Sequence, residues 1–112
     1  MFDLPNHYIL EDKTVKQVDF LTWIMWYQQA DRTIARTEIG NVIVSTVFFG
    51  LDFSLGSEEY PELFETMILG GELDGTKIRA TTWEQAEELH ERYVSMVKAE
   101  MADHTLDAEV IG

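Results

Sequence analysis

The sequence predicts one α+β domain in which a four-stranded antiparallel sheet, built from two hairpins, is flanked by an N-terminal helix and a longer C-terminal helix. Two observations predict the sheet, because β-branched and apolar residues alternate around Gly40-Asn41 and again around Asp74-Gly75. A third predicts the helices, since apolar residues recur with a 3.6-residue period near both ends of the chain. With 112 residues and no cysteine, a single core must be stabilised by packing alone.

The first helix is expected to follow an extended N-terminal arm. Residues 1–12 carry Pro5 and lack periodicity, so we expect an arm there, one domain over residues 13–104 and a C-terminal tail over residues 105–112. Asp19 can cap a helix whose apolar residues recur at three- and four-residue steps. They are Phe20, Trp23, Ile24 and Tyr27, with Leu21, Met25 and Trp26 widening the apolar face.

Two hairpins supply the four strands. Gly40-Asn41 suits a two-residue turn, and the strand after it is apolar on both faces, which predicts a central strand covered on both sides. Residues 50–61 are rich in turn-forming residues and predict a loop. Leu63–Leu69 is the expected third strand, and Asp74-Gly75 favours a type I′ turn into a fourth strand over Thr76–Thr81.

The last helix begins at a recognisable capping motif. Thr82 and Gln85 have the spacing of a capping box, so a long helix is expected to start there and to end near Asp103. Its apolar stripe comprises Ala86, Leu89, Tyr93, Met96 and Val97. Glutamates occupy the opposite face and the first turns, where the helix dipole favours them: Glu84, Glu87, Glu88 and Glu91.

The net charge of −13 excludes some partners. Twenty-one acidic against eight basic residues repel phosphate backbones and anionic membranes, so we expect neither direct nucleic-acid binding nor membrane binding. The chain has no signal-peptide pattern and no apolar run near the roughly 20 residues of a membrane helix, so a cytoplasmic location is expected. An acidic surface keeps a protein in solution, and it also suits a basic protein partner.

Two motif-like segments fail on chemical grounds. The run Gly70–Lys77 approaches phosphate-loop spacing, but it has Thr76-Lys77 in reversed order and two acidic residues that repel phosphate. His90-Glu91 begins like a zinc-protease helix, but Val94 stands where the second histidine is needed. We therefore expect no metal and no cofactor, and His90 is better explained as a partly buried structural residue.

Charged residues are unevenly distributed along the chain. One run without any base carries Glu58, Glu59, Glu62, Glu65, Glu72 and Asp74, whereas Arg32, Arg36, Lys77 and Arg79 lie on the predicted first and fourth strands. Outward charges on edge strands discourage edge-to-edge pairing, which explains these bases without a ligand. Alternatively, the four cations converge on a small anionic ligand.

Several short motifs, taken together, resemble a group of small proteins that occur in bacteriophages and prophages and have no established activity. The motifs are Ser45-Thr46-Val47-Phe48, Gly50-Leu51-Asp52, Leu63-Phe64-Glu65-Thr66-Met67, Gly70-Gly71, Leu73-Asp74-Gly75 and Thr82-Trp83-Glu84. In that family a histidine often follows the residue equivalent to Asp52, whereas this chain has Phe53, which weakens any Asp-His chemistry. The resemblance implies an accessory protein that acts by binding in a host cytoplasm.

Three functions follow as hypotheses. The first is a non-catalytic binder of a basic host or phage protein, through the acidic residues Glu58, Glu59, Glu62, Glu72 and Asp74. The second is a binder of a small molecule, such as a nucleotide signal, in which Arg32, Arg36, Lys77 or Arg79 contacts phosphate and which can form a homo-oligomer. The third is a small hydrolase that uses Asp52, Glu65 or His90 as acid or base.

Overall fold

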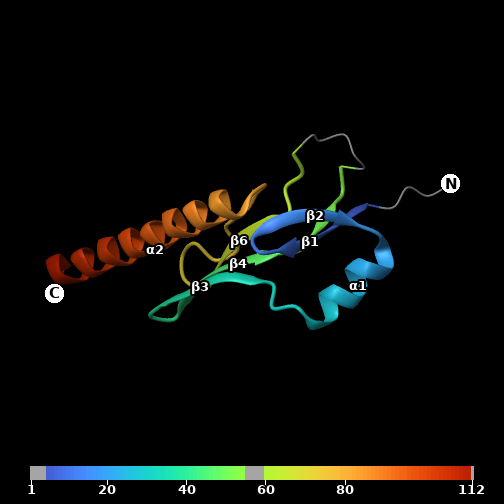
Figure 1. The fold of residues 1–112 in the computed structure, drawn as a ribbon. Helices are drawn as coiled ribbons and strands as arrows, with labels where there is room; N and C mark the ends of the chain where they lie inside the picture. The colour runs from blue at the N-terminus through green and yellow to red at the C-terminus, as the bar shows by residue number, and fades with distance from the viewer. Residues whose placement is uncertain (1–4, 55–59, 112) are drawn as a thin grey trace.

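The computed structural model describes residues 5–54 and 60–111, and the side chains of residues 5–54 and 60–103. It contains two helices and two antiparallel sheets (Figure 1). The larger sheet has the strand order β3-β4-β6-β7, with bounds Thr33–Ile39, Val42–Phe48, Phe64–Leu69 and Lys77–Ala80. The smaller sheet has the order β2-β1-β5, with bounds Thr14–Val18, Asn6–Glu11 and Leu51–Asp52. The helices are α1, Phe20–Gln29, and α2, Trp83–Ile111.

The larger sheet confirms the predicted four antiparallel strands. Its first hairpin closes on Gly40-Asn41, with Ile39 paired to Val42. Gly40 has a φ of 60° and Asn41 does not have a positive φ, which is the pattern of a type II′ turn. The prediction of a type I′ turn at Asp74-Gly75 is wrong, because only Gly75 of that pair has a positive φ. The β6–β7 connection is a longer loop in which Asp74 Oδ1 accepts the Gly70 N–H at 2.6 Å.

Helix α2 covers one face of the larger sheet. Its contacts extend to β3, β4, β6 and β7, and the buried residues of β4 alternate from Val42 to Phe48 on the face toward it. The capping box is confirmed, since Thr82 Oγ1 accepts the Gln85 N–H at 3.1 Å. The predicted end near Asp103 and the tail over 105–112 are wrong, because α2 continues to Ile111. No Gly or Pro interrupts the sequence before Gly112, so helix propagation has no local stop.

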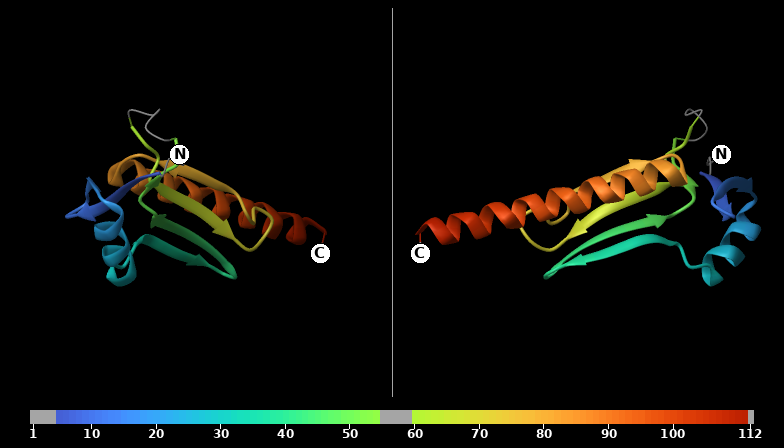
Figure 2. Two further views of the ribbon diagram at one scale, coloured as in Figure 1. Left: turned by 90° about the vertical axis from the view of Figure 1, so that its right-hand side faces the viewer. Right: turned by 60° about the vertical axis from the view of Figure 1, so that its left-hand side comes forward.

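The opposite face of this sheet is open. The left view of Figure 2 looks onto the strands with α2 behind them, and no other described helix or strand lies over this face. Ile43, Val47 and Met67 are therefore only half-buried, and Leu69 is 42% exposed. The prediction that β4 is covered on both sides is thus wrong within the described residues, because α2 and the Trp26 side chain of α1 both pack on the face that carries Val42 to Phe48.

The smaller sheet was absent from the sequence-based prediction. The predicted N-terminal arm forms β1, and β1 pairs with β2 around Asp12 and Lys13, whose φ values of 51° and 69° match a type I′ turn. Non-glycine residues adopt this conformation rarely, so the turn carried no recognisable signal. β5, inside the predicted loop over 50–61, pairs with β1 through Asn6 and Asp52. The expected boundary between residues 12 and 13 therefore falls inside a hairpin.

Helix α1 begins at the predicted cap, since Asp19 Oδ1 accepts the Thr22 N–H at 2.7 Å. It packs on β1, where the Trp23 ring lies 5.2 Å from His7. Its outer face remains uncovered by the described residues, with Leu21 69% and Met25 64% exposed.

A core cluster joins the two sheets. Phe48 and Phe64 of the larger sheet are fully buried, and their rings lie 5.0 Å apart. Tyr8, Leu10 and Val15 of the smaller sheet pack against this cluster. The smaller sheet and α1 thus lie at one end of the larger sheet, and α2 projects from the other end (Figure 1).

Candidate functional site: a cleft between the two sheets

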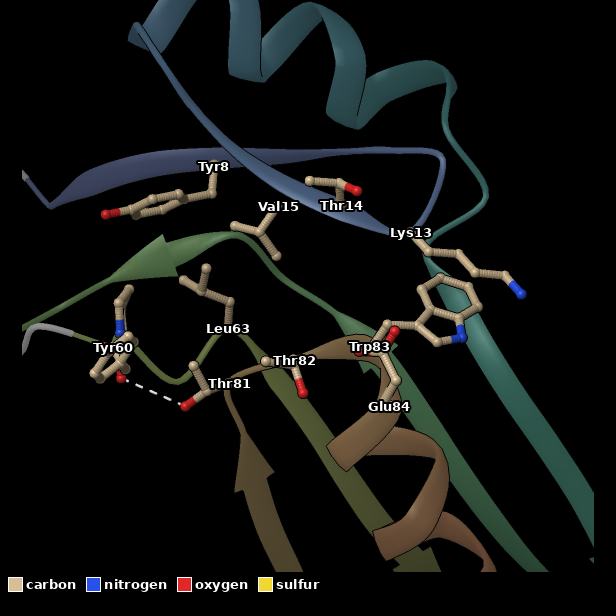
Figure 3. A pocket seen from close by; sticks show the side chains of 11 residues that line it. Tyr8, Lys13, Thr14, Val15, Tyr60, Leu63, Thr81, Thr82, Trp83 and Glu84 are labelled. Atoms are coloured by element: carbon tan, nitrogen blue, oxygen red, sulfur yellow. Dashed lines mark hydrogen bonds between the residues drawn. The ribbon is translucent and has the colours of Figure 1, made fainter.

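A cavity opens where the two sheets meet. It has a volume of about 420 Å³. The smaller sheet contributes Tyr8, Lys13, Thr14 and Val15, and the facing wall consists of Tyr60, Pro61, Leu63 and Thr81 to Glu84. Figure 3 shows Tyr8 and Tyr60 at one end of the cleft and Lys13 with Trp83 at the other. Cavities of this size with aromatic walls and a few polar groups are typical of small-molecule sites.

A lysine ammonium and a tyrosine phenol lie at opposite ends of the cleft. Lys13 Nζ lies 5.5 Å above the centroid of the Trp83 ring, which places a cation at one end of the cavity. The type I′ turn fixes the backbone from which this side chain extends. At the other end, burial, aided by the charge of Asp52, raises the pKa of the Tyr8 phenol. Tyr8 therefore remains a hydrogen-bond donor at neutral pH.

The N-terminus of α2 lines the floor of the cleft, and the capping box satisfies the N–H groups of Thr81 and Gln85 there. Thr82 accepts the Gln85 N–H, and Gln85 Oε1 accepts the Thr81 N–H at 2.8 Å. The Thr81 hydroxyl donates to the Tyr60 carbonyl at 3.4 Å, which connects two segments of the same wall (Figure 3). Glu84 adds a carboxylate beside these groups. Among the residues that line the cleft, Lys13 is the one with a cationic side chain.

Asp52 lines a second, smaller hollow of about 160 Å³ together with Glu62 and Arg79. The side chain is 4% exposed, and its Oδ1 accepts the Ser54 N–H at 2.9 Å as well as the Ser54 hydroxyl. These bonds stabilise the chain as it leaves β5. Asp52 thus has a structural role at the junction of the sheets.

His90 lies in the core between α2 and the larger sheet. It is 2% exposed, its Nε2 lies 2.9 Å from Thr37 Oγ1, and its Nδ1 lies 2.8 Å from Thr46 Oγ1. Thr46 in turn bonds Thr66 at 2.6 Å, so the network connects α2 with three strands. Burial lowers the pKa of His90, which favours the neutral ring that can donate at one nitrogen and accept at the other. The prediction of a buried structural histidine is consistent with this placement.

The three proposed acid–base residues do not share one cleft. Glu65 lies on the open face of the larger sheet, where Arg79 Nε approaches its Oε2 at 3.2 Å. Thr66, the next residue along β6, points to the opposite face and belongs to the His90 network. His90 and Glu65 are therefore on opposite sides of the sheet, and Asp52 is in the hollow beside Arg79. Proton transfer between such groups needs hydrogen-bond reach or one bridging water.

The four proposed cations are divided between the two edges of the larger sheet. Arg32 precedes β3 and lies 3.5 Å from the centroid of the Tyr27 ring, and Arg36 Nη1 pairs with Glu38 at 2.6 Å. Lys77 and Arg79 lie on β7, at the other edge. Three strand spacings, about 14 Å in total, separate the two edges within one chain. A shared anion site in a monomer is not supported by this arrangement.

The proposed acidic residues also fall in different places. Glu62 precedes β6, whereas Glu72 and Asp74 follow it, so they lie near opposite ends of that strand. Glu58 and Glu59 lie outside the described residues. The exposed glutamates of α2, namely Glu84, Glu87, Glu88 and Glu91, form a denser acidic group on one helix.

Sequence reasoning missed the cleft because it missed the smaller sheet. Lys13 and Tyr8 gain meaning only when β1 and β2 pair and bring them opposite Trp83 and Tyr60. The local signal was the apolar run Tyr8-Ile9-Leu10, which is weak over so short a segment.

Within the described ranges, no helix combines the length and apolarity of a membrane span. In the same part of the chain, no three His, Asp or Glu side chains are arranged to hold a metal ion. Comparison of the whole chain with known protein families, curated proteins and solved structures yields no match.

Proposed function

We propose that this protein is a non-catalytic binder of a small aromatic molecule, held in the cleft between the two sheets. The observation that supports this most is the composition of that cleft, in which Tyr8, Tyr60 and Trp83 surround apolar walls and Lys13 provides one cation. Aromatic rings bind such walls through stacking and apolar contact, and a lysine selects ligands that carry an acidic group.

The net charge of the protein limits the class of ligand. At −13 the protein repels highly charged anions at long range, so a nucleoside, a nucleoside monophosphate or an aromatic carboxylate suits the cleft better than a polyphosphate. A ring between Tyr60 and Tyr8 leaves its acidic group free to approach Lys13 at the opposite end. Small-molecule binding, the second hypothesis from the sequence, is thus retained, but with Lys13 as the cation in place of Arg32, Arg36, Lys77 and Arg79.

Removing the charge of Lys13 is expected to weaken binding of the anionic ligands. In a thermal-shift panel of nucleosides, nucleoside monophosphates and aromatic carboxylates, at least one member should raise the melting temperature of the wild type at millimolar concentration. Lys13→Gln should then weaken an anionic member about 5- to 10-fold and leave a neutral one unchanged. Lys16→Gln, on the exposed part of β2 outside the cleft, is the matched control and should bind like wild type.

Two outcomes contradict the proposal. One is a panel in which every member leaves the melting temperature of the wild type unchanged. The other is an equal loss of affinity in Lys13→Gln and Lys16→Gln, which indicates a general effect of net charge instead of a site at Lys13.

A second candidate function is binding of a basic protein, which for a phage accessory protein is a host protein in the bacterial cytoplasm. It is favoured by the solvent-facing glutamates of α2, where Arg92 neutralises only Glu88, at 3.1 Å. Glu87→Lys with Glu91→Lys should abolish salt-sensitive capture of the partner from a bacterial lysate, because long-range attraction follows the local charge. Capture of the same proteins by wild type and variant argues against this function.

A further inference from the structure

Strand β3 forms one edge of the larger sheet, and no described strand pairs with its outer side. It spans seven residues, Thr33–Ile39, and contains neither Pro nor Gly. Such an edge presents unpaired N–H and C=O groups that can hydrogen-bond a further strand. An edge of this kind is usually protected by charged side chains, so the signs of its charges determine what can pair with it.

The register identifies the backbone groups that point outward. In an antiparallel hairpin closed by two residues, the flanking pair, here Ile39 and Val42, is hydrogen-bonded, and such pairs alternate along the ladder. Ile39 and Thr37 therefore direct their N–H and C=O groups toward β4. Arg36 and Glu38 direct theirs toward the free edge.

The side chains at this edge are complementary to a second copy of themselves. If two β3 strands pair antiparallel around Thr37, Arg36 lies opposite Glu38 of the other copy, and Ala35 lies opposite Ile39. The alternative registers centred on Arg36 or Glu38 place like charges opposite each other. Arg36 and Glu38 are 51% and 61% exposed and already approach each other within one chain at 2.6 Å, so both are available to exchange partners.

The other edge of the sheet lacks this property. On β7 the outward charges of the open face are Lys77 and Arg79, and pairing two copies around Ile78 places these cations opposite each other. Like charges directly opposite are destabilising. The charges of β7 thus discourage self-pairing around Ile78, whereas those of β3 favour it in the register around Thr37.

We propose that two copies of this chain associate through β3, in antiparallel register around Thr37, and join their four-stranded sheets into one. The two-fold axis is perpendicular to the sheet, so both α2 helices cover the same face and both open faces form one surface. The interface consists of one strand pair and is small compared with stable dimer interfaces, so association should depend on concentration in the micromolar range.

Charge reversal tests this arrangement by sedimentation velocity. Wild type should shift from 12.9 kDa toward twice that mass as concentration rises. Arg36→Glu and Glu38→Arg should each raise the dimer dissociation constant about 10-fold or more, since each variant places like charges across the axis. The double variant, Arg36→Glu with Glu38→Arg, should restore association. An equimolar mixture of the two single variants should form a heterodimer.

Comparison of Glu38→Pro with Glu38→Gln separates pairing from charge, because both variants remove the carboxylate and only proline also removes the N–H. Glu38→Pro removes an outward N–H while leaving the hydrogen bonds to β4 intact, so it should be monomeric with an unchanged circular dichroism spectrum. The proposal is overturned if wild type remains monomeric at about 0.5 mM, far above the micromolar range expected for the interface. It is also overturned if the single charge reversals and Glu38→Pro leave the dissociation constant unchanged.

Discussion

Replacing Gly50 with alanine is expected to cost at least about 3 kcal/mol of the free energy of unfolding. Gly50 has a φ of 70°, and a Cβ there would lie 2.3 Å from the backbone oxygen of Tyr8. The same Cβ would lie 2.9 Å from the Phe48 ring. The Gly50 carbonyl accepts the Tyr8 N–H at 2.8 Å, so relieving the clash moves β1 away from the larger sheet.

The matched control is Gly75→Ala. Gly75 has a φ of 86°, but a Cβ there meets no atom within 4 Å. Gly75→Ala should therefore lower the free energy of unfolding only by the conformational cost of a left-handed alanine, about 1–2 kcal/mol. Urea denaturation of both variants measures the difference. Equal losses in the two variants would show that the close approach of β1 to Gly50 does not occur in solution.

The second large effect is expected from His90→Leu, which should cost about 2–4 kcal/mol of the free energy of unfolding. Leucine fills much of the space but leaves the Thr37 hydroxyl without its partner and removes one partner of Thr46. The cost of a buried polar group without a partner exceeds the net gain of the bond itself. A loss below about 0.5 kcal/mol in urea denaturation would argue against the network.

Adding Thr37→Val separates polarity from packing. In the double variant the unpaired hydroxyl is gone, so the loss should be smaller than the sum of the two single losses. Additive losses would show that Thr37 and His90 act independently.

His90 also gives the protein a dependence on pH. Because its pKa is lower in the folded state than in the unfolded state, the folded protein binds fewer protons, and stability falls as pH drops below about 6.5. Carboxylates titrate in the same range, and Glu91, which favours the charged ring, opposes the effect of burial. The measurement is therefore the difference in the free energy of unfolding between wild type and His90→Leu, which should shrink as pH falls below about 6.5.

The parts of the fold that the sequence predicted are those with strong local signals. The caps at Asp19 and Thr82 are each confirmed by a hydrogen bond to a backbone N–H three residues further along the chain. The hairpin at Gly40-Asn41 is confirmed for a similar reason, since a glycine with positive φ is a local requirement of its turn. Such signals depend only on neighbouring residues, so they can be read without knowing the rest of the fold.

The parts of the fold that the sequence did not predict depend on contacts between residues distant in sequence. Asp12 and Lys13 form a turn that gains stability from the packing of Tyr8 and Val15 on the core, which no local pattern reveals. The apolar residues of β4 on its open face suggested a second covering layer, but the described helices contact this strand on the opposite face, α2 along its length and α1 through Trp26 at Phe48. The cleft residues Tyr60 and Trp83 come together with Tyr8 and Lys13 only through this docking of the smaller sheet.

The most direct test of ligand binding in the cleft uses the three tryptophan indoles as internal reporters. Trp83 lines the cleft, whereas Trp23 stacks on Tyr27 and Trp26 packs against Phe48. Protein labelled with ¹⁵N is titrated with each nucleoside, nucleoside monophosphate and aromatic carboxylate of the panel. The expected result is a saturable shift of the Trp83 indole resonance with little change at Trp23 and Trp26. If no member of the panel shifts Trp83, or if all three resonances move equally, the cleft is not the binding site.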